Sequence, residues 1–289
     1  MLLRKSQILT IAAGLGVTLL AFMPLLQWLV DYTSSNTQLL HAFIILAFAG
    51  AMLIYERNER IQFAPGYNKQ VFWGFLISYG FISIAFFAKL SLLYLPALVG
   101  AIYGWCHYLF GVRYNRVVTA LLVAFSLFLG LLILFPTMDW PLRMLAGQIS
   151  HIIFSQLGGE THLFLMKENV AQAEPLLIVT MGGRPFEVAP ECNGFGMLSA
   201  STLLSVLLSV YYRLGIGRST LLVLISLLSS FAMNLIRILI IVYLAPWVGD
   251  HYYTMHEIIG ITAFWMALIG IWMIGKRFDE QTASPSEST

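Results

Sequence analysis

Long apolar stretches, separated by short polar loops, set the pattern of this chain. Eight of them hold about 20 predominantly apolar residues each, which is the length that a helix needs to cross the hydrocarbon core of a bilayer. They lie at approximately residues 8–30, 38–55, 70–88, 91–110, 117–136, 192–212, 219–244 and 254–275. The pattern therefore predicts an all-α multi-pass membrane protein with about eight transmembrane helices.

The segment between the fifth and sixth runs, residues 137–191, is too long for a simple connection and is expected to have structure of its own. Apolar residues recur at helical spacing from Leu142 to Leu157, which predicts an amphipathic helix on the outer membrane surface. The β-prone stretches Leu176–Thr180 and Phe186–Val188 flank Gly182-Gly183, a pair that suits a tight turn. We therefore expect a small β-hairpin before the sixth helix.

These patterns divide the chain into four regions. Residues 1–136 are expected to form an N-terminal membrane region of five helices, and residues 137–191 an extracytoplasmic segment with the amphipathic helix and the hairpin. Residues 192–275 are expected to form a C-terminal region of three helices. The tail, residues 276–289, ends in a polar stretch and is predicted to be disordered in the cytoplasm.

Composition narrows the class of protein and its partners. Hydrophobic residues make up 59% of the 289 positions and charged residues 10%, with a mean hydropathy of +0.81, which excludes an ordinary soluble domain. The net charge is only +2 and the basic residues are scattered, so no nucleic acid partner is expected. The two cysteines, Cys106 and Cys192, lie far apart, which suggests neither a disulfide framework nor a zinc site.

The basic residues orient the chain across the membrane. With the N-terminus in the cytoplasm, eleven of the 16 Lys and Arg residues fall in cytoplasmic segments and only four in outer ones, as the positive-inside rule requires. Both ends of the chain are then cytoplasmic. The eleven are Arg4, Lys5, Arg57, Arg60, Lys69, Arg113, Arg116, Arg213, Arg218, Lys276 and Arg277.

Arg237 lies in the middle of the seventh run, where a lone cation costs about 2.5–3.5 kcal/mol and needs compensation. In this topology Cys192 and His256 lie at the outer ends of the sixth and eighth helices, and Arg237 lies about 12 Å below the outer end of the seventh. The three side chains can meet in the outer leaflet. Asn234, three residues before Arg237, shares its helix face and can bond the guanidinium or a substrate peptide.

A thiol, a guanidinium and an imidazole together suit nucleophilic acyl transfer. A nearby cation favours the reactive thiolate of Cys192, and the positive end of a helix dipole adds to this. His256 can take the thiol proton and return it to the leaving amine. Arg237, which is always protonated, can stabilise the oxyanion that forms.

The same residues are also compatible with a protein that is not an enzyme. A lone Cys at a helix end is often only a small buried hydrophobe. The alternative function is a non-catalytic transporter or assembly factor that binds an anionic ligand through Arg237; broken helices or a second buried charge would favour it, and the sequence pattern indicates neither. His256-Glu257 begins like a zinc-protease signature, but Gly260 stands where the second His would be, so no metal or other cofactor is expected.

Three short motifs resemble the exosortase/archaeosortase family of membrane-embedded cysteine transpeptidases. They are Pro190-Glu191-Cys192-Asn193-Gly194, Asn234-Leu235-Ile236-Arg237 and His256-Glu257-Ile258-Ile259-Gly260. The order Cys, Arg, His on three successive C-terminal helices is that family's pattern, and the resemblance covers residues 135–275 by motif and the whole chain by topology. Many members have Ser between the Cys and the Gly, where this chain has Asn193.

The resemblance implies a cysteine peptidase or transpeptidase in the cytoplasmic (inner) membrane of a bacterium or archaeon, with its active site facing outside. Its partners would be exported proteins with a C-terminal sorting tail, which holds a short motif such as Pro-Glu-Pro, a transmembrane helix and a basic cluster. The tail would be cut through a thioester on Cys192, and the protein passed to an acceptor such as a lipid or a glycan. Hydrolysis and transfer both stay open. The implied catalytic residues are Cys192, Arg237 and His256, supported by Glu191, Asn193, Gly194 and Asn234.

Overall fold

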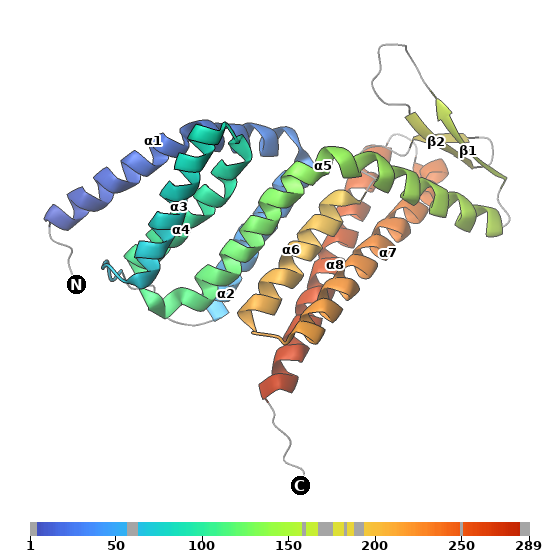
Figure 1. Cartoon of the computed structure of the whole chain (residues 1–289). Helices are drawn as coiled ribbons and strands as arrows, with labels where there is room; N and C mark the ends of the chain where they lie inside the picture. The colour runs from blue at the N-terminus through green and yellow to red at the C-terminus, as the bar shows by residue number, and fades with distance from the viewer. Residues whose placement is uncertain are drawn as a thin grey trace, which may run out of the picture.

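A computed structural model describes residues 5–56, 63–157, 160–166, 176–181, 184–187, 194–248 and 251–283. Within these ranges the chain forms eight α-helices and one small sheet, which confirms the predicted all-α multi-pass architecture (Figure 1). The helices are α1 Lys5–Ser35, α2 Thr37–Glu56, α3 Lys69–Ala88, α4 Tyr94–Phe110, α5 Asn115–Gln156, α6 Phe195–Tyr211, α7 Ile216–Val248 and α8 Tyr252–Ala283.

Seven of the described helices are long and apolar enough to cross a membrane, and α6 is an apolar helix of only 17 residues. At a rise of 1.5 Å per residue α6 is about 26 Å long, slightly less than the hydrocarbon core. It is enclosed by α2, α5, α7 and α8, all of which pack against it. Twelve of its residues are buried, so α6 forms the centre of the C-terminal half of the bundle.

The fifth predicted span and the predicted amphipathic helix form one continuous helix, α5, of 42 residues. Pro136 and Pro141 lie inside it, and Figure 1 shows the helix changing direction on the way to its second half. A proline removes one hydrogen bond and its ring clashes with the carbonyl four residues earlier, which bends a helix without ending it. The predicted boundary between residues 136 and 137 therefore falls within one element.

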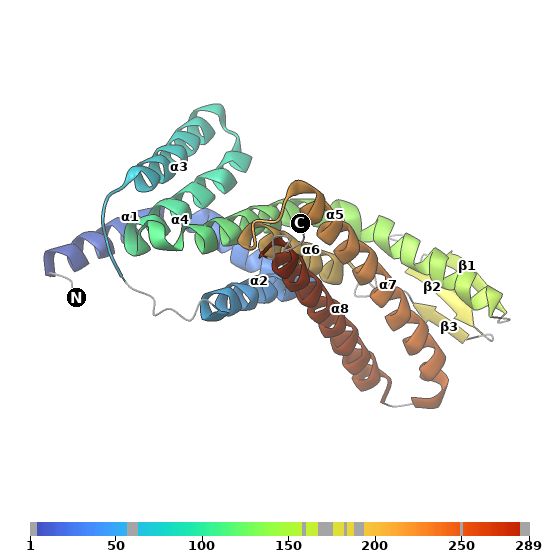
Figure 2. The ribbon, with the colours of Figure 1, turned by 90° about the horizontal axis from the view of Figure 1, so that it is seen from below.

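A three-stranded antiparallel sheet lies along the second half of α5 (Figure 2). Strands β2 (Leu176–Met181) and β3 (Arg184–Glu187) pair with Met181 opposite Arg184, as the predicted hairpin requires, while residues 182–183 and Val188 lie outside the described ranges. The sequence pattern did not predict β1 (Thr161–Met166), which pairs with β2.

The end of the chain differs from the prediction. We expected a disordered tail from residue 276, whereas α8 continues to Ala283. Helix formers such as Lys276, Glu280 and Ala283 continue the helix beyond its apolar part, because a helix can leave the membrane without ending. Residues 284–289 lie outside the described ranges.

Helices α3 and α4 form a hairpin (Figure 2). Their backbones are in contact at glycines. A Cβ atom built on Gly74 would lie 2.7 Å from the Cα of Gly104 and 3.1 Å from the carbonyl oxygen of Gly100. Backbone atoms cannot turn aside as a side chain can. Small residues at this contact therefore hold the pair together by close van der Waals packing, as is usual for helices in membranes.

We expect Gly74→Ala to destabilise the protein by about 1–3 kcal/mol, because the added methyl group would force α3 away from α4. Gly80→Ala is the matched control, since Gly80 lies on the same helix and a Cβ there would have no neighbour within 4 Å. The midpoint of thermal unfolding in detergent should fall for the first variant and not for the second. Equal midpoints for the two variants would contradict the close contact.

Candidate functional site

Arg237 on α7 and His256 on α8 lie side by side. The guanidinium Nη2 is 3.4 Å from Nε2 of the imidazole, and both side chains are half-buried. An arginine only donates hydrogen bonds, so Nε2 faces it with a lone pair when the imidazole is neutral. Two of the three side chains predicted to act together are thus in contact.

A glycine makes room for this arginine. A Cβ atom built on Gly260, one turn after His256, would lie 3.2 Å from Nε and 3.3 Å from Cζ of Arg237. The guanidinium therefore lies directly against the backbone of α8. A methyl group at position 260 would require the guanidinium to shift by a few tenths of an ångström.

The start of α6 lies close to Arg237 and His256, because it contacts Asn234 on α7. This side chain is fully buried on α7, one turn before Arg237. A Cβ atom built on Gly194 would lie 2.8 Å from Cγ and Nδ2 of Asn234, and Gly194 has a φ of +78°, in the left-handed region that favours glycine. The contact and the backbone conformation both require glycine where α6 begins.

A residue that the sequence pattern did not single out also lies here. Oε1 of Gln38, on the first turn of α2, accepts a hydrogen bond of 2.9 Å from the backbone N–H of Gly196 on the first turn of α6. In the sequence Gln38 is only a polar residue at the start of an apolar run. The two residues are 158 positions apart, so only the fold reveals the contact.

Four of the seven predicted site residues, Gly194, Asn234, Arg237 and His256, thus gather where α6, α7 and α8 meet. The other three, Glu191, Cys192 and Asn193, lie outside the described ranges. Figure 1 shows that α2, α6 and α8 start at the end of the bundle that carries the sheet. The described part of the cluster therefore lies toward that end.

A second buried cation corrects one expectation. Arg143 on α5 falls in the stretch predicted to be an amphipathic helix, and the sequence pattern indicated no second buried charge, yet only 5% of its side chain is exposed. Its Nη2 bonds Oδ2 of Asp139 at 2.5 Å, and its guanidinium lies 5.6 Å from the ring centroid of Trp140. The carboxylate offsets this charge locally, so Arg143 does not supply the unbalanced positive charge that binding an anion would need.

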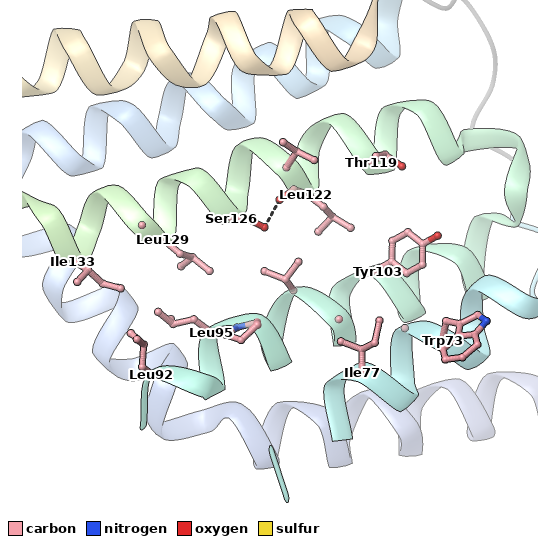
Figure 3. Close-up of a pocket in the computed structure, with 16 residues that line it drawn as sticks. Trp73, Ile77, Leu92, Leu95, Tyr103, Thr119, Leu122, Ser126, Leu129 and Ile133 are labelled. Atoms are coloured by element: carbon pink, nitrogen blue, oxygen red, sulfur yellow. Dashed lines mark hydrogen bonds between the residues drawn. The ribbon is translucent and has the colours of Figure 1, made fainter. Parts of the chain in front are cut away.

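The described residues also line a cavity of about 730 Å³ between α3, α4 and α5 (Figure 3). Its lining is mostly apolar, and the hydroxyl of Ser126 donates to the carbonyl of Leu122 on its own helix. No lining residue is a carboxylate, an imidazole, a thiol or a cation. The cavity can hold an apolar group but lacks the groups for acyl transfer. Among the described residues, no group of His, Cys, Asp or Glu is placed to hold a metal ion.

Comparison with known proteins gives one match. The family model described as Transmembrane exosortase (Exosortase_EpsH) matches residues 28–273. That range contains Gln38, Cys192 and the whole cluster on α6, α7 and α8. No curated protein sequence and no solved structure matches the chain significantly.

Proposed function

Because the chain belongs to the transmembrane exosortase family, we propose that it is a cysteine peptidase or transpeptidase that cleaves C-terminal sorting tails of exported proteins. The observation that carries the proposal is the contact of Arg237 with His256, next to the start of α6. A base and a fixed cation beside the chain segment that holds a cysteine are the groups that thiol acyl transfer needs.

Chain connectivity supports Cys192 as the nucleophile. Cys192 precedes Gly194 by two residues, and two residues span at most about 7 Å. Gly194 contacts Asn234, which lies one helical turn from Arg237. The connectivity of the chain is therefore compatible with Cys192 as the nucleophile that acts together with Arg237 and His256. Cys106, the other cysteine, lies near the inner end of α4 among Tyr114, Val118 and Leu122.

In the proposed reaction Nε2 of His256 takes the proton from the Cys192 thiol, and the thiolate attacks the carbonyl carbon of the scissile peptide bond. For this the guanidinium of Arg237 has to leave Nε2. The oxyanion that forms on the substrate is a charged acceptor for the guanidinium and replaces Nε2 in this role. At a separation of 3.4 Å the hydrogen bond to Nε2 is weak, so little free energy is lost when it breaks.

The tetrahedral intermediate then collapses. The C–N bond breaks, the imidazolium of His256 gives its proton to the leaving amine, and a thioester remains on Cys192. Water or the nucleophile of an acceptor, such as a lipid or a glycan, attacks the thioester and releases the protein. Glu191, Asn193, Gly194 and Asn234 are the supporting residues in this proposal, and Asn234 can bond the guanidinium of Arg237 or the substrate peptide.

The placement in the membrane is part of the same proposal. We place the chain in the cytoplasmic membrane, with both ends inside and the site facing outside, where exported tails arrive. The distribution of basic residues supports this orientation. Residues 192–275 then form a catalytic region on the five-helix region of residues 1–136, with residues 137–191 outside.

We expect Cys192→Ala to lower tail cleavage by at least about a thousandfold, because removal of a nucleophile leaves only residual catalysis. Cys192→Ser should retain little activity, since a hydroxyl is much harder to ionise than a thiol. The assay is an immunoblot of a tagged substrate protein in membranes. Cys106→Ala, the matched control, should cleave normally. Full cleavage by Cys192→Ala would exclude it as the nucleophile.

Gly260→Ala should lower cleavage about tenfold, because its methyl group would shift the guanidinium of Arg237 by a few tenths of an ångström, and catalysis is sensitive to small misplacements. Gly270→Ala is the control on the same helix, since a Cβ there would have no neighbour within 4 Å. Arg237→Lys should be nearly as damaging, because a single ammonium does not replace the forked guanidinium. Wild-type rates in Gly260→Ala or Arg237→Lys would show that Arg237 has no geometric role.

The orientation can be tested with the two cysteines. A membrane-impermeant thiol reagent applied to intact spheroplasts should label Cys192, on the outer side, and spare Cys106, near the inner end of α4. Variants that keep only one of the two cysteines assign the label. Labelling of Cys106 but not Cys192 would overturn the proposed orientation.

A further inference from the structure

The first turn of α6 has a cap that comes from another helix. The first backbone N–H groups of a helix have no partner within it, and the side chain of the residue before the helix usually accepts from one of them. Here that residue is Gly194, which has no side chain to do so. The N–H of Gly196 donates instead to the side chain of Gln38 on α2.

A cap of the usual kind is excluded at Gly194. A serine or aspartate there would place its Cβ 2.8 Å from Asn234 and would have to adopt a left-handed backbone conformation. The requirement for a glycine beside Asn234 therefore leaves a helix start without its own cap. Gln38 supplies the acceptor from a distant part of the chain.

Gln38 is itself held firmly. The next residue, Leu39, is fully buried in the main hydrophobic core, and Phe195 at the start of α6 belongs to the same core. A Cβ atom built on Gly196 would lie 3.1 Å from Cβ and 3.3 Å from Cα of Gln38, so the two helices are in close contact here. An acceptor on a packed helix fixes its donor more precisely than one on a loop.

We propose that Gln38 is a positioning residue for the nucleophile: by capping the first turn of α6 it fixes the direction in which the chain enters that helix, and with it Cys192. This inference rests on the proposed function. It also extends the site beyond α6, α7 and α8, because an N-terminal helix then supplies one of its parts.

The test uses variants that differ in the acceptor alone, all in a Cys106→Ala background so that Cys192 is the only thiol. Gln38→Leu keeps the approximate size and removes the acceptor, and Gln38→Asn keeps the amide but is one methylene too short. Gln148→Leu, at an exposed position of α5, is the control. Three quantities are measured: kcat and KM with a tail peptide, the rate of Cys192 alkylation by iodoacetamide, and the midpoint of thermal unfolding.

Gln38→Leu and Gln38→Asn should lower kcat by between about tenfold and about a hundredfold, with KM within about twofold of wild type. Alkylation of Cys192 should slow about tenfold, because the thiol is no longer held where the site favours the thiolate. The unfolding midpoint should fall by no more than about 2–4 °C relative to Gln148→Leu, which is the effect of a lost helix cap. If Gln38→Leu does not insert into membranes, the kcat and the alkylation rate of Gln38→Asn alone test the proposal.

Wild-type kcat and alkylation in a folded Gln38 variant would overturn the proposal. A fall in the unfolding midpoint with an unchanged kcat would do the same, since it assigns Gln38 a purely structural role. These outcomes are separate from failure of the proposed function, which an active Cys192→Ala would show. An inactive Cys192→Ala beside fully active Gln38 variants rejects only the role of Gln38.

Discussion

Arg237 lies in the mostly apolar helix α7, where its charge has to be surrounded by polar groups. The arrangement of the proposed site follows from this requirement. A cation at that depth costs about 2.5–3.5 kcal/mol unless polar groups surround it. Among the described residues, His256 lies 3.4 Å from the guanidinium, and the missing side chain of Gly260 lets the guanidinium lie against the backbone of α8. In the proposed reaction the guanidinium of Arg237 turns toward the negative charge that develops on the substrate, whereas Arg143 is held in an ion pair with Asp139.

The proposed site involves four of the eight described helices, α2, α6, α7 and α8. Asn234 is buried beside Gly194, so α6 must begin with a glycine and cannot cap itself. Gln38 on α2 takes over that function. On this proposal the three C-terminal helices do not complete the site alone. The boundary between residues 1–136 and residues 192–275 divides the sequence, whereas the hydrogen bond between Gln38 and Gly196 crosses it.

The sequence predicted those features that depend on local pattern. The apolar runs predicted the eight helices. The isolated charge of Arg237 identified it as a candidate site residue, and in the structure it contacts His256. Features that depend on tertiary contacts were missed. The pattern did not show that the helix passes through Pro136, because a proline can either end a helix or only bend it. It did not show that Gln38 accepts from Gly196, because the two residues are 158 positions apart.

The central claim is that acyl transfer passes through Cys192, and trapping the intermediate tests it most directly. The purified protein, mixed with a tail peptide and quenched in acid, is digested and analysed by mass spectrometry. The account predicts that the N-terminal part of the peptide is attached to Cys192 and is released by neutral hydroxylamine, as a thioester is. Cleavage of the peptide with no adduct on Cys192, or with the adduct on another residue, would contradict it.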